Sequence, residues 1–238
     1  MEPLVLLDTN VILARCLDPG MDAKGSLADS VFATLREGKL VPYITESVRR
    51  EFELKLHDRV GQVLGILRTF SKEPAPIPTA EKSSLEAMED LFAKLRTAAP
   101  EAVGAIQVLE NRLVKIVGSA PIPTEQAWGH LLGRVAVETT ELQAEIQKRF
   151  ETSGVEVIRS PSTVDMEPFR AFVPRTDLEH IGAASSLAKQ RDRVVIFVTL
   201  DSPLHAVRDQ ISSTDPKLVI TTPAYLADQI GRLRNSPR

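Results

Sequence analysis

Short apolar runs alternate along this chain with segments of helical periodicity. The first run, Leu4 to Leu7, contains no polar residue, which is typical of a strand buried on both faces of a parallel sheet. Similar runs occur at 40–44, 155–158, 194–198 and 218–220, with helical patterns between them. Strands joined by helices specify a doubly wound, mostly parallel sheet. The sequence therefore predicts an α/β fold with about five strands.

A proline-rich segment at 73–79 interrupts this alternation. Its prolines exclude a helix interior, and the residues that follow, up to about 150, show apolar residues only at helical spacing. We therefore predict a helical insertion at 71–153 in a sheet domain made of 1–70 and 154–238. Its apolar faces would pack together, or would bind a second copy of the chain or an inhibitory partner protein.

Composition narrows the class of protein. With 238 residues, 43% of them hydrophobic, the chain can bury a sizeable core. No apolar run is long enough to cross a membrane, no secretory signal is recognisable, and the single cysteine excludes an internal disulfide, so we expect a cytoplasmic protein. The net charge of −3 provides no basic surface overall, so a polyanion would be bound through a local basic patch or through metal.

Acidic residues stand where the predicted strands end. Asp8 directly follows the first strand and Asp201 follows the strand at 194–198, while Asp177 opens the preceding helix and Glu51 lies on the helix after the second strand. Ligands of open parallel sheets bind outside the carboxyl ends of the strands. Clustered carboxylates repel one another unless a cation neutralises them. The arrangement predicts a site for Mg²⁺ or Mn²⁺, which prefer carboxylate oxygen.

Each of these acids also has a structural interpretation. The three aspartates lie where a carboxylate would cap a helix or interact with its dipole. Helical phase places Glu51 and Glu53 at opposite margins of one apolar face, and Glu46 is a further candidate, so periodicity alone does not choose among them. The placement of all the acids at one sheet edge favours a functional site.

Nearby basic groups are candidates for contacts with a phosphate. Arg49 and Arg50 are adjacent to Glu51 and are the best local candidates for nucleic-acid binding, although a solvated helix face explains them equally well. His180 and His205 each lie one turn after one of the aspartates. Either would assist at a phosphate or serve as a structural histidine.

Together these features resemble the PIN domain family of nucleases. The resemblance covers about residues 4–70 and 155–233 and rests on the order and spacing of several short motifs: Asp8-Thr9-Asn10-Val11, the glutamate after the second strand, the Asp177 helix with Gly182-Ala183-Ala184, Val198-Thr199-Leu200-Asp201, and the closing segment Leu218 to Leu226.

The resemblance implies a ribonuclease that depends on Mg²⁺ or Mn²⁺. Its metal-binding and catalytic quartet would be Asp8, Glu51, Asp177 and Asp201, and Asn10 and Thr199 would orient carboxylates or water. RNA phosphodiester bonds would be hydrolysed by a water activated at the metal. Many small members are toxins of toxin–antitoxin pairs, and the helical insertion makes this chain larger than those.

Two other functions fit parts of the pattern. Haloacid-dehalogenase-like phosphatases also place an aspartate after the first strand, but they need a second one two residues later, where this chain has Asn10. A catalytically silent scaffold of the same fold would bind RNA or protein. The presence of all four acids argues against that alternative.

Overall fold

The computed structural model describes residues 2–17, 23–79, 81, 83–98, 103–118, 122, 124–159 and 163–235. The chain forms two compact units. One, here the sheet unit, is Met1–Leu54 with Ile146–Arg238, and the other, the helical unit, is Lys55–Glu145. The helices α3 (Glu46–Phe70) and α6 (Glu125–Glu151) contribute residues to both units. The domain bounds drawn from the sequence stay a prediction.

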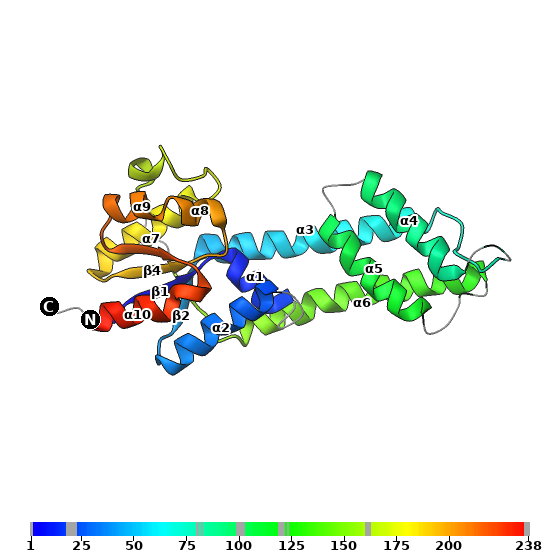
Figure 1. The fold of residues 1–238 in the computed structure, drawn as a ribbon, viewed down its shortest axis with the longest axis horizontal. Coiled ribbons are helices and arrows are strands. Elements are labelled where there is room, and N and C mark those ends of the chain that lie inside the picture. The colour runs from blue at the N-terminus through cyan, green and yellow to red at the C-terminus, as the bar shows by residue number, and fades with distance from the viewer. Residues whose placement is uncertain are drawn as a thin grey trace. The chain divides into compact units, whose positions relative to one another are not determined.

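The sheet unit contains a five-stranded sheet in which every pairing is parallel (Figure 1). The strand order is β3-β2-β1-β4-β5. The strands are β1 (Leu4–Leu7), β2 (Pro42–Thr45), β3 (Glu156–Ile158), β4 (Val195–Val198) and β5 (Leu218–Thr221). This confirms the predicted α/β fold with a doubly wound parallel sheet and a helical segment between its strands.

Helices cover both faces of the sheet, with α7 and α9 on one face and α10 on the other (Figure 1). Within the described residues, the sheet unit also contains further helices and two 3-10 turns. The bounds are α1 (Thr9–Leu17), α2 (Ala23–Glu37), η2 (Glu167–Phe169), α7 (Leu178–Arg191), α8 (Ser202–Ala206), α9 (Arg208–Thr214), η3 (Pro223–Tyr225) and α10 (Leu226–Asn235).

Alternation of side chains along the strands explains the two layers. Leu6 and Phe197 point to the face that packs on Ile181 and Leu187 of α7, all within one apolar cluster. Their neighbours in β1 and β4 point to the opposite face, because successive strand residues alternate, and are equally buried. A strand buried on both faces needs the uninterrupted apolar run that the sequence shows.

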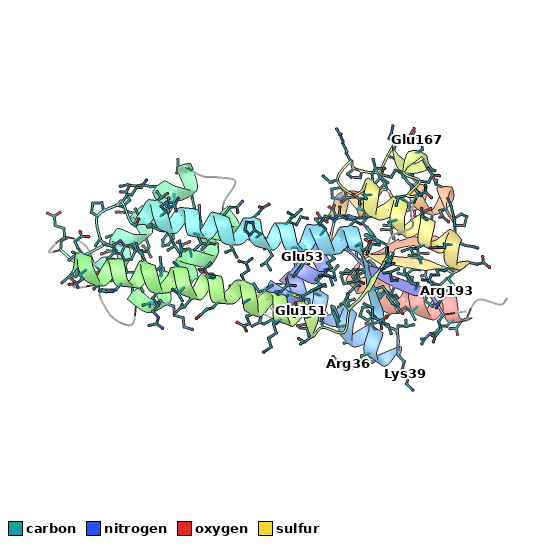
Figure 2. The ribbon with its side chains drawn as sticks, turned by 180° about the vertical axis from the view of Figure 1, so that it is seen from behind. Arg36, Lys39, Glu53, Glu151, Glu167 and Arg193 are labelled. Atoms are coloured by element: carbon teal, nitrogen blue, oxygen red, sulfur yellow. The ribbon has the colours of Figure 1, made fainter. Side chains whose placement is uncertain are left out.

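The turn that ends α2 begins with Gly38. The helix ends at Glu37, and the Leu40 N–H donates to the Leu35 carbonyl at 2.8 Å, which satisfies an end carbonyl. The left-handed residue in this turn is Lys39, with φ 52°, and not the glycine. Figure 2 labels Lys39 at this end of α2.

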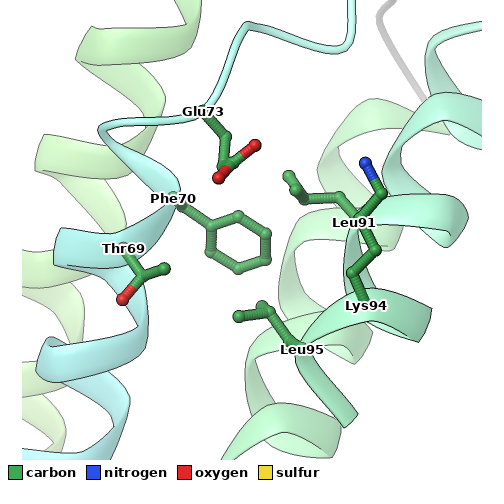
Figure 3. Close-up of a pocket in the computed structure, with 6 residues that line it drawn as sticks. All are labelled: Thr69, Phe70, Glu73, Leu91, Lys94 and Leu95. Carbon is green, nitrogen blue, oxygen red and sulfur yellow. The ribbon is translucent and has the colours of Figure 1, made fainter. Parts of the chain in front are cut away.

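The helical unit contains α4 (Ser84–Ala98), α5 (Val103–Val117) and the greater parts of α3 and α6. Its core includes Phe70, whose ring meets Phe92 edge-on at 5.0 Å and Trp128 at 6.2 Å between centroids. A shallow pocket of about 150 Å³ lies beside Phe70 and is lined by Thr69, Phe70, Glu73, Leu91, Lys94 and Leu95 (Figure 3). No helix in the described ranges is long and apolar enough to span a bilayer.

Gly182 allows a close approach between α7 and the segment before it. A Cβ at this position would lie 2.8 Å from Val164 Cγ1, 3.1 Å from Met166 Cγ and 3.2 Å from the Asp165 carbonyl oxygen. Because one of these neighbours is backbone and another is a short branched side chain, little can move aside. The glycine thus fixes how closely this segment packs on the helix that carries His180.

We expect Gly182→Ala to lower the free energy of unfolding by about 1–3 kcal/mol, because the added methyl group overpacks this contact. Gly61→Ala is the matched control. It adds the same group within α3 with nothing inside 4 Å of the new Cβ, so it should raise stability by up to about 1 kcal/mol. Denaturant unfolding of both variants measures this, and a Gly182→Ala protein as stable as the control would contradict the packing argument.

Candidate metal centre

Asp8 is the first residue after β1 and is buried, with 5% of its surface exposed. Its Oδ1 accepts a hydrogen bond from the Thr9 N–H at 2.7 Å, and its Oδ2 accepts one from the Thr199 hydroxyl at 2.6 Å. Burial raises the pKa of this carboxyl, although the hydrogen bond from Thr199 and the charge of His180 oppose the shift. Asp8 is therefore held in one orientation at the carboxyl end of the central strand.

Glu51 reaches the same place from α3. Val48 and Phe52 form the buried stripe of this helix, and Phe52 stacks on Phe150 of α6 with ring centroids 4.8 Å apart. This contact fixes the rotation of the helix and turns the neighbouring position, Glu51, toward β1. The Glu51 carboxylate accepts a hydrogen bond from the Thr9 hydroxyl.

His180, on the first turn of α7, is held at both ring nitrogens by one turn of α3. Its Nδ1 lies 3.2 Å from the Ser47 hydroxyl oxygen and its Nε2 lies 2.8 Å from Glu51 Oε2. Burial alone would lower the pKa of His180, but the hydrogen bond and charge of Glu51, with Asp8 and Asp177, outweigh it and raise that pKa. The imidazole is 6% exposed, so it is part of the interior.

Asp8, Glu51 and His180 form a compact set of donors. One ligand atom from each residue lies within 4.8 Å of the other two. Two carboxylate oxygens and an imidazole nitrogen are common metal ligands, and a single cation would offset the repulsion between the carboxylates. The donor set is consistent with a metal site.

Asp177 lies close enough to this set to respond to its charge. Burial, followed by the charges of Asp8, Asp201 and Glu51, raises the pKa of Asp177 to about 6, and His180 lowers it in part. Asp177 is the N-cap residue of α7, yet within the described chain its side chain accepts no capping hydrogen bond. Helix capping, the structural explanation offered by the sequence, therefore does not account for the orientation of this carboxylate.

Asp201 and the two residues predicted to orient the site form one network. The Asn10 side chain accepts from the Leu200 N–H at 3.0 Å, and the Thr199 hydroxyl accepts from the Asp201 N–H at 2.9 Å. Asp201 also caps α8, because its Oδ1 accepts from the Leu204 N–H at 3.4 Å. Hydrogen bonds thus link Asp8, the end of β4 and the cap of α8. A catalytic role for Asn10, Thr199 and Asp201 stays a prediction.

The other candidates on α3 lie on its exposed side. Glu46 is exposed, and Glu53, labelled in Figure 2, forms an ion pair with Arg49 at 3.0 Å. Arg50 is also exposed. Of the three glutamates weighed from the sequence, Glu51 is the one that contacts the cluster. Contact of Arg49 and Arg50 with nucleic acid stays a prediction.

Sequence reasoning did not assign His180 to the metal site. The available signal was its spacing of one turn from Asp177, which places both side chains on one side of α7. The spacing alone could not exclude a structural histidine. The contact of His180 Nε2 with the Glu51 carboxylate shows that this histidine lies in the cluster.

Comparison of the chain with models of protein families, with curated proteins and with solved structures found no match.

The metal-free protein should lose stability as pH rises from about 4 to about 7. The pKa values of Asp8, Asp177 and His180 are all raised by folding, so the folded chain binds more protons than the unfolded chain. For the aspartates the loss begins above the ordinary value of 3.8 and, for Asp177, is complete above about 6. For His180 it occurs above 6.5.

Thermal unfolding in a chelator across this pH range, compared with Asp177→Asn, tests the effect. The variant lacks one of the repelling charges, so its unfolding midpoint should fall less steeply with pH. Asp209→Asn, at an exposed aspartate, is the control and should keep the slope of the parent protein. Identical slopes in all three proteins would show that Asp177 does not sense the cluster.

Proposed function

We propose that this chain is a divalent-metal-dependent ribonuclease of the PIN domain type. The observation that carries the proposal is the convergence of Asp8, Glu51 and His180 within 4.8 Å, from three segments distant in the sequence. The response of Asp177 to the charges of both Asp8 and Asp201 supports the wider acidic quartet. The parallel sheet and the motif order that resembles this family agree with it.

The residues of the site would have two roles, to bind the metal and to orient its ligands. Asp8 and Glu51, with Asp177 and Asp201, would hold Mg²⁺ or Mn²⁺, which supplies an activated water and offsets charge on the phosphoryl oxygens. Thr199 and Thr9 donate hydroxyl hydrogen bonds to Asp8 and Glu51 respectively and keep the carboxylates in place. RNA is the proposed substrate.

The structure also bears on the alternative phosphatase function. Asn10 occupies the position that would need a second aspartate, and its side chain is engaged by the Leu200 N–H and by the Thr199 hydroxyl. Asn10 therefore stabilises the loop after β4, and we do not propose phosphatase activity. Experiment must distinguish the proposed ribonuclease from a catalytically silent scaffold of the same fold.

We expect Mn²⁺-dependent cleavage of a labelled mixed RNA pool, reduced more than about 100-fold in Glu51→Gln and in Asp8→Asn. Removal of even an outer partner of a metal ligand commonly costs about 10- to 100-fold, so removal of a ligand should cost more. Initial cleavage rates with and without chelator measure the effect.

Glu46→Gln is the matched control, since it makes the same change at an exposed residue of the same helix and should cleave at the parental rate. Circular dichroism and thermal unfolding establish that each variant is folded, which matters most for the buried Asp8. Equal cleavage by parent and both site variants, or cleavage that persists in chelator, would reject the proposed metal-dependent site. Absence of cleavage by the parent would leave the scaffold.

A further inference from the structure

We infer that His180 is itself a ligand of the bound cation, through Nε2, so that the site favours a first-row transition ion such as Mn²⁺ over Mg²⁺. The inference rests on the proposed metal-dependent function and deepens it by identifying the class of metal. An acidic quartet alone would offer only oxygen, which suits Mg²⁺. A nitrogen donor changes that preference.

The imidazole is oriented as a metal ligand requires. A ligating histidine almost always donates its other ring N–H to a fixed acceptor, which sets the tautomer and the direction of the free nitrogen. Here the Ser47 hydroxyl oxygen faces Nδ1 at 3.2 Å, and it is fixed in turn by the Thr45 hydroxyl at 2.8 Å. The Nδ1–H would donate to Ser47 and leave the Nε2 lone pair directed into the cluster.

The environment of Nε2 suits a cation as its partner. With its proton on Nδ1, a neutral imidazole would direct its Nε2 lone pair at Glu51 Oε2, 2.8 Å away, so that both atoms could bind one cation. Glu51 already accepts a hydrogen bond from the Thr9 hydroxyl. A shared cation would bind both Nε2 and the Glu51 carboxylate, which already lie within hydrogen-bonding distance of each other.

The burial of the group is compatible with a metal ligand. His180 is 6% exposed and Ser47 is 7% exposed, so this is an interior polar network. Such a network is stable when every member is satisfied, and the pairing of Nε2 with a carboxylate is satisfied by a cation as well as by a proton. Ser47, Thr45 and Glu51 thus position His180, and His180 meets the ion.

Pulsed electron paramagnetic resonance of Mn²⁺ bound to the full chain tests this directly. We expect nitrogen coupling from a coordinated imidazole in the parent protein, absent in His180→Gln. Glutamine can supply an oxygen from a similar position, so the variant should still bind Mn²⁺ but with a preference for Mn²⁺ over Mg²⁺ reduced by about 10-fold or more, measured by calorimetric titration of each ion.

Two further variants test the role of Ser47 and provide a matched control. Ser47→Ala removes the acceptor of Nδ1 and should weaken Mn²⁺ binding by about 10-fold while nitrogen coupling persists. His57→Gln makes the same substitution as the test variant at an exposed histidine and should keep both the coupling and the affinity.

The outcomes separate this inference from the proposed function. Bound Mn²⁺ without nitrogen coupling in the parent protein would place His180 outside the coordination sphere and overturn the inference, while a carboxylate metal site would stand. Failure of the parent to bind Mn²⁺ at all would overturn both. If His180→Gln does not fold, the parent spectrum and the Ser47→Ala affinity still decide.

Discussion

Parallel pairing of β1 with β4 is the interaction on which the candidate site depends. Leu7 lies opposite Val198 in the register, and the Asp8 N–H extends the ladder by donating to the Val198 carbonyl at 2.9 Å. The two strands therefore end together, and the next residues of each, Asp8 and Thr199, meet side by side. A slip of one residue would turn every side chain of a strand to the other face, and the burial of both strands on both faces opposes such a slip.

The charge of the carboxylates explains why hydroxyl groups lie beside them at this edge of the sheet. A buried carboxylate is costly unless hydrogen bonds or opposite charge compensate it, and here Thr9 and Thr199 each donate to an acid. These contacts fix the direction of the oxygens but do not remove the repulsion between the acids, since the charges of Asp8 and Asp201 add to burial in raising the pKa of Asp177. The protein therefore brings two carboxylates and an imidazole together at this edge, an arrangement that is consistent with a metal site.

The sequence was sufficient to predict the sheet and the aspartates at its edge, because both follow from local pattern. An uninterrupted apolar run identifies a strand buried on both faces, and the residue after such a run must lie at the carboxyl end of the sheet. The backbone conformation of individual turn residues was harder to predict from the sequence. The turn after α2 places its left-handed conformation at Lys39 although a glycine precedes it, because the hydrogen bonds of the whole turn decide which residue adopts that conformation.

Glu51 and His180 were harder to predict for a common physical reason: both depend on the rotation of a helix about its axis, which only tertiary packing fixes. Glu51 lies at the margin of the buried stripe of α3, where a modest rotation separates a half-buried position from a solvated one, and the stacking of Phe52 on Phe150 favours the first. On α7, Gly182 fixes how closely the segment before the helix packs, two residues after the imidazole. Each helix alone leaves its residue's role open. Once both are packed, Ser47 and Glu51, one turn apart, meet the two nitrogens of a single imidazole, so the cluster depends on the core that surrounds it.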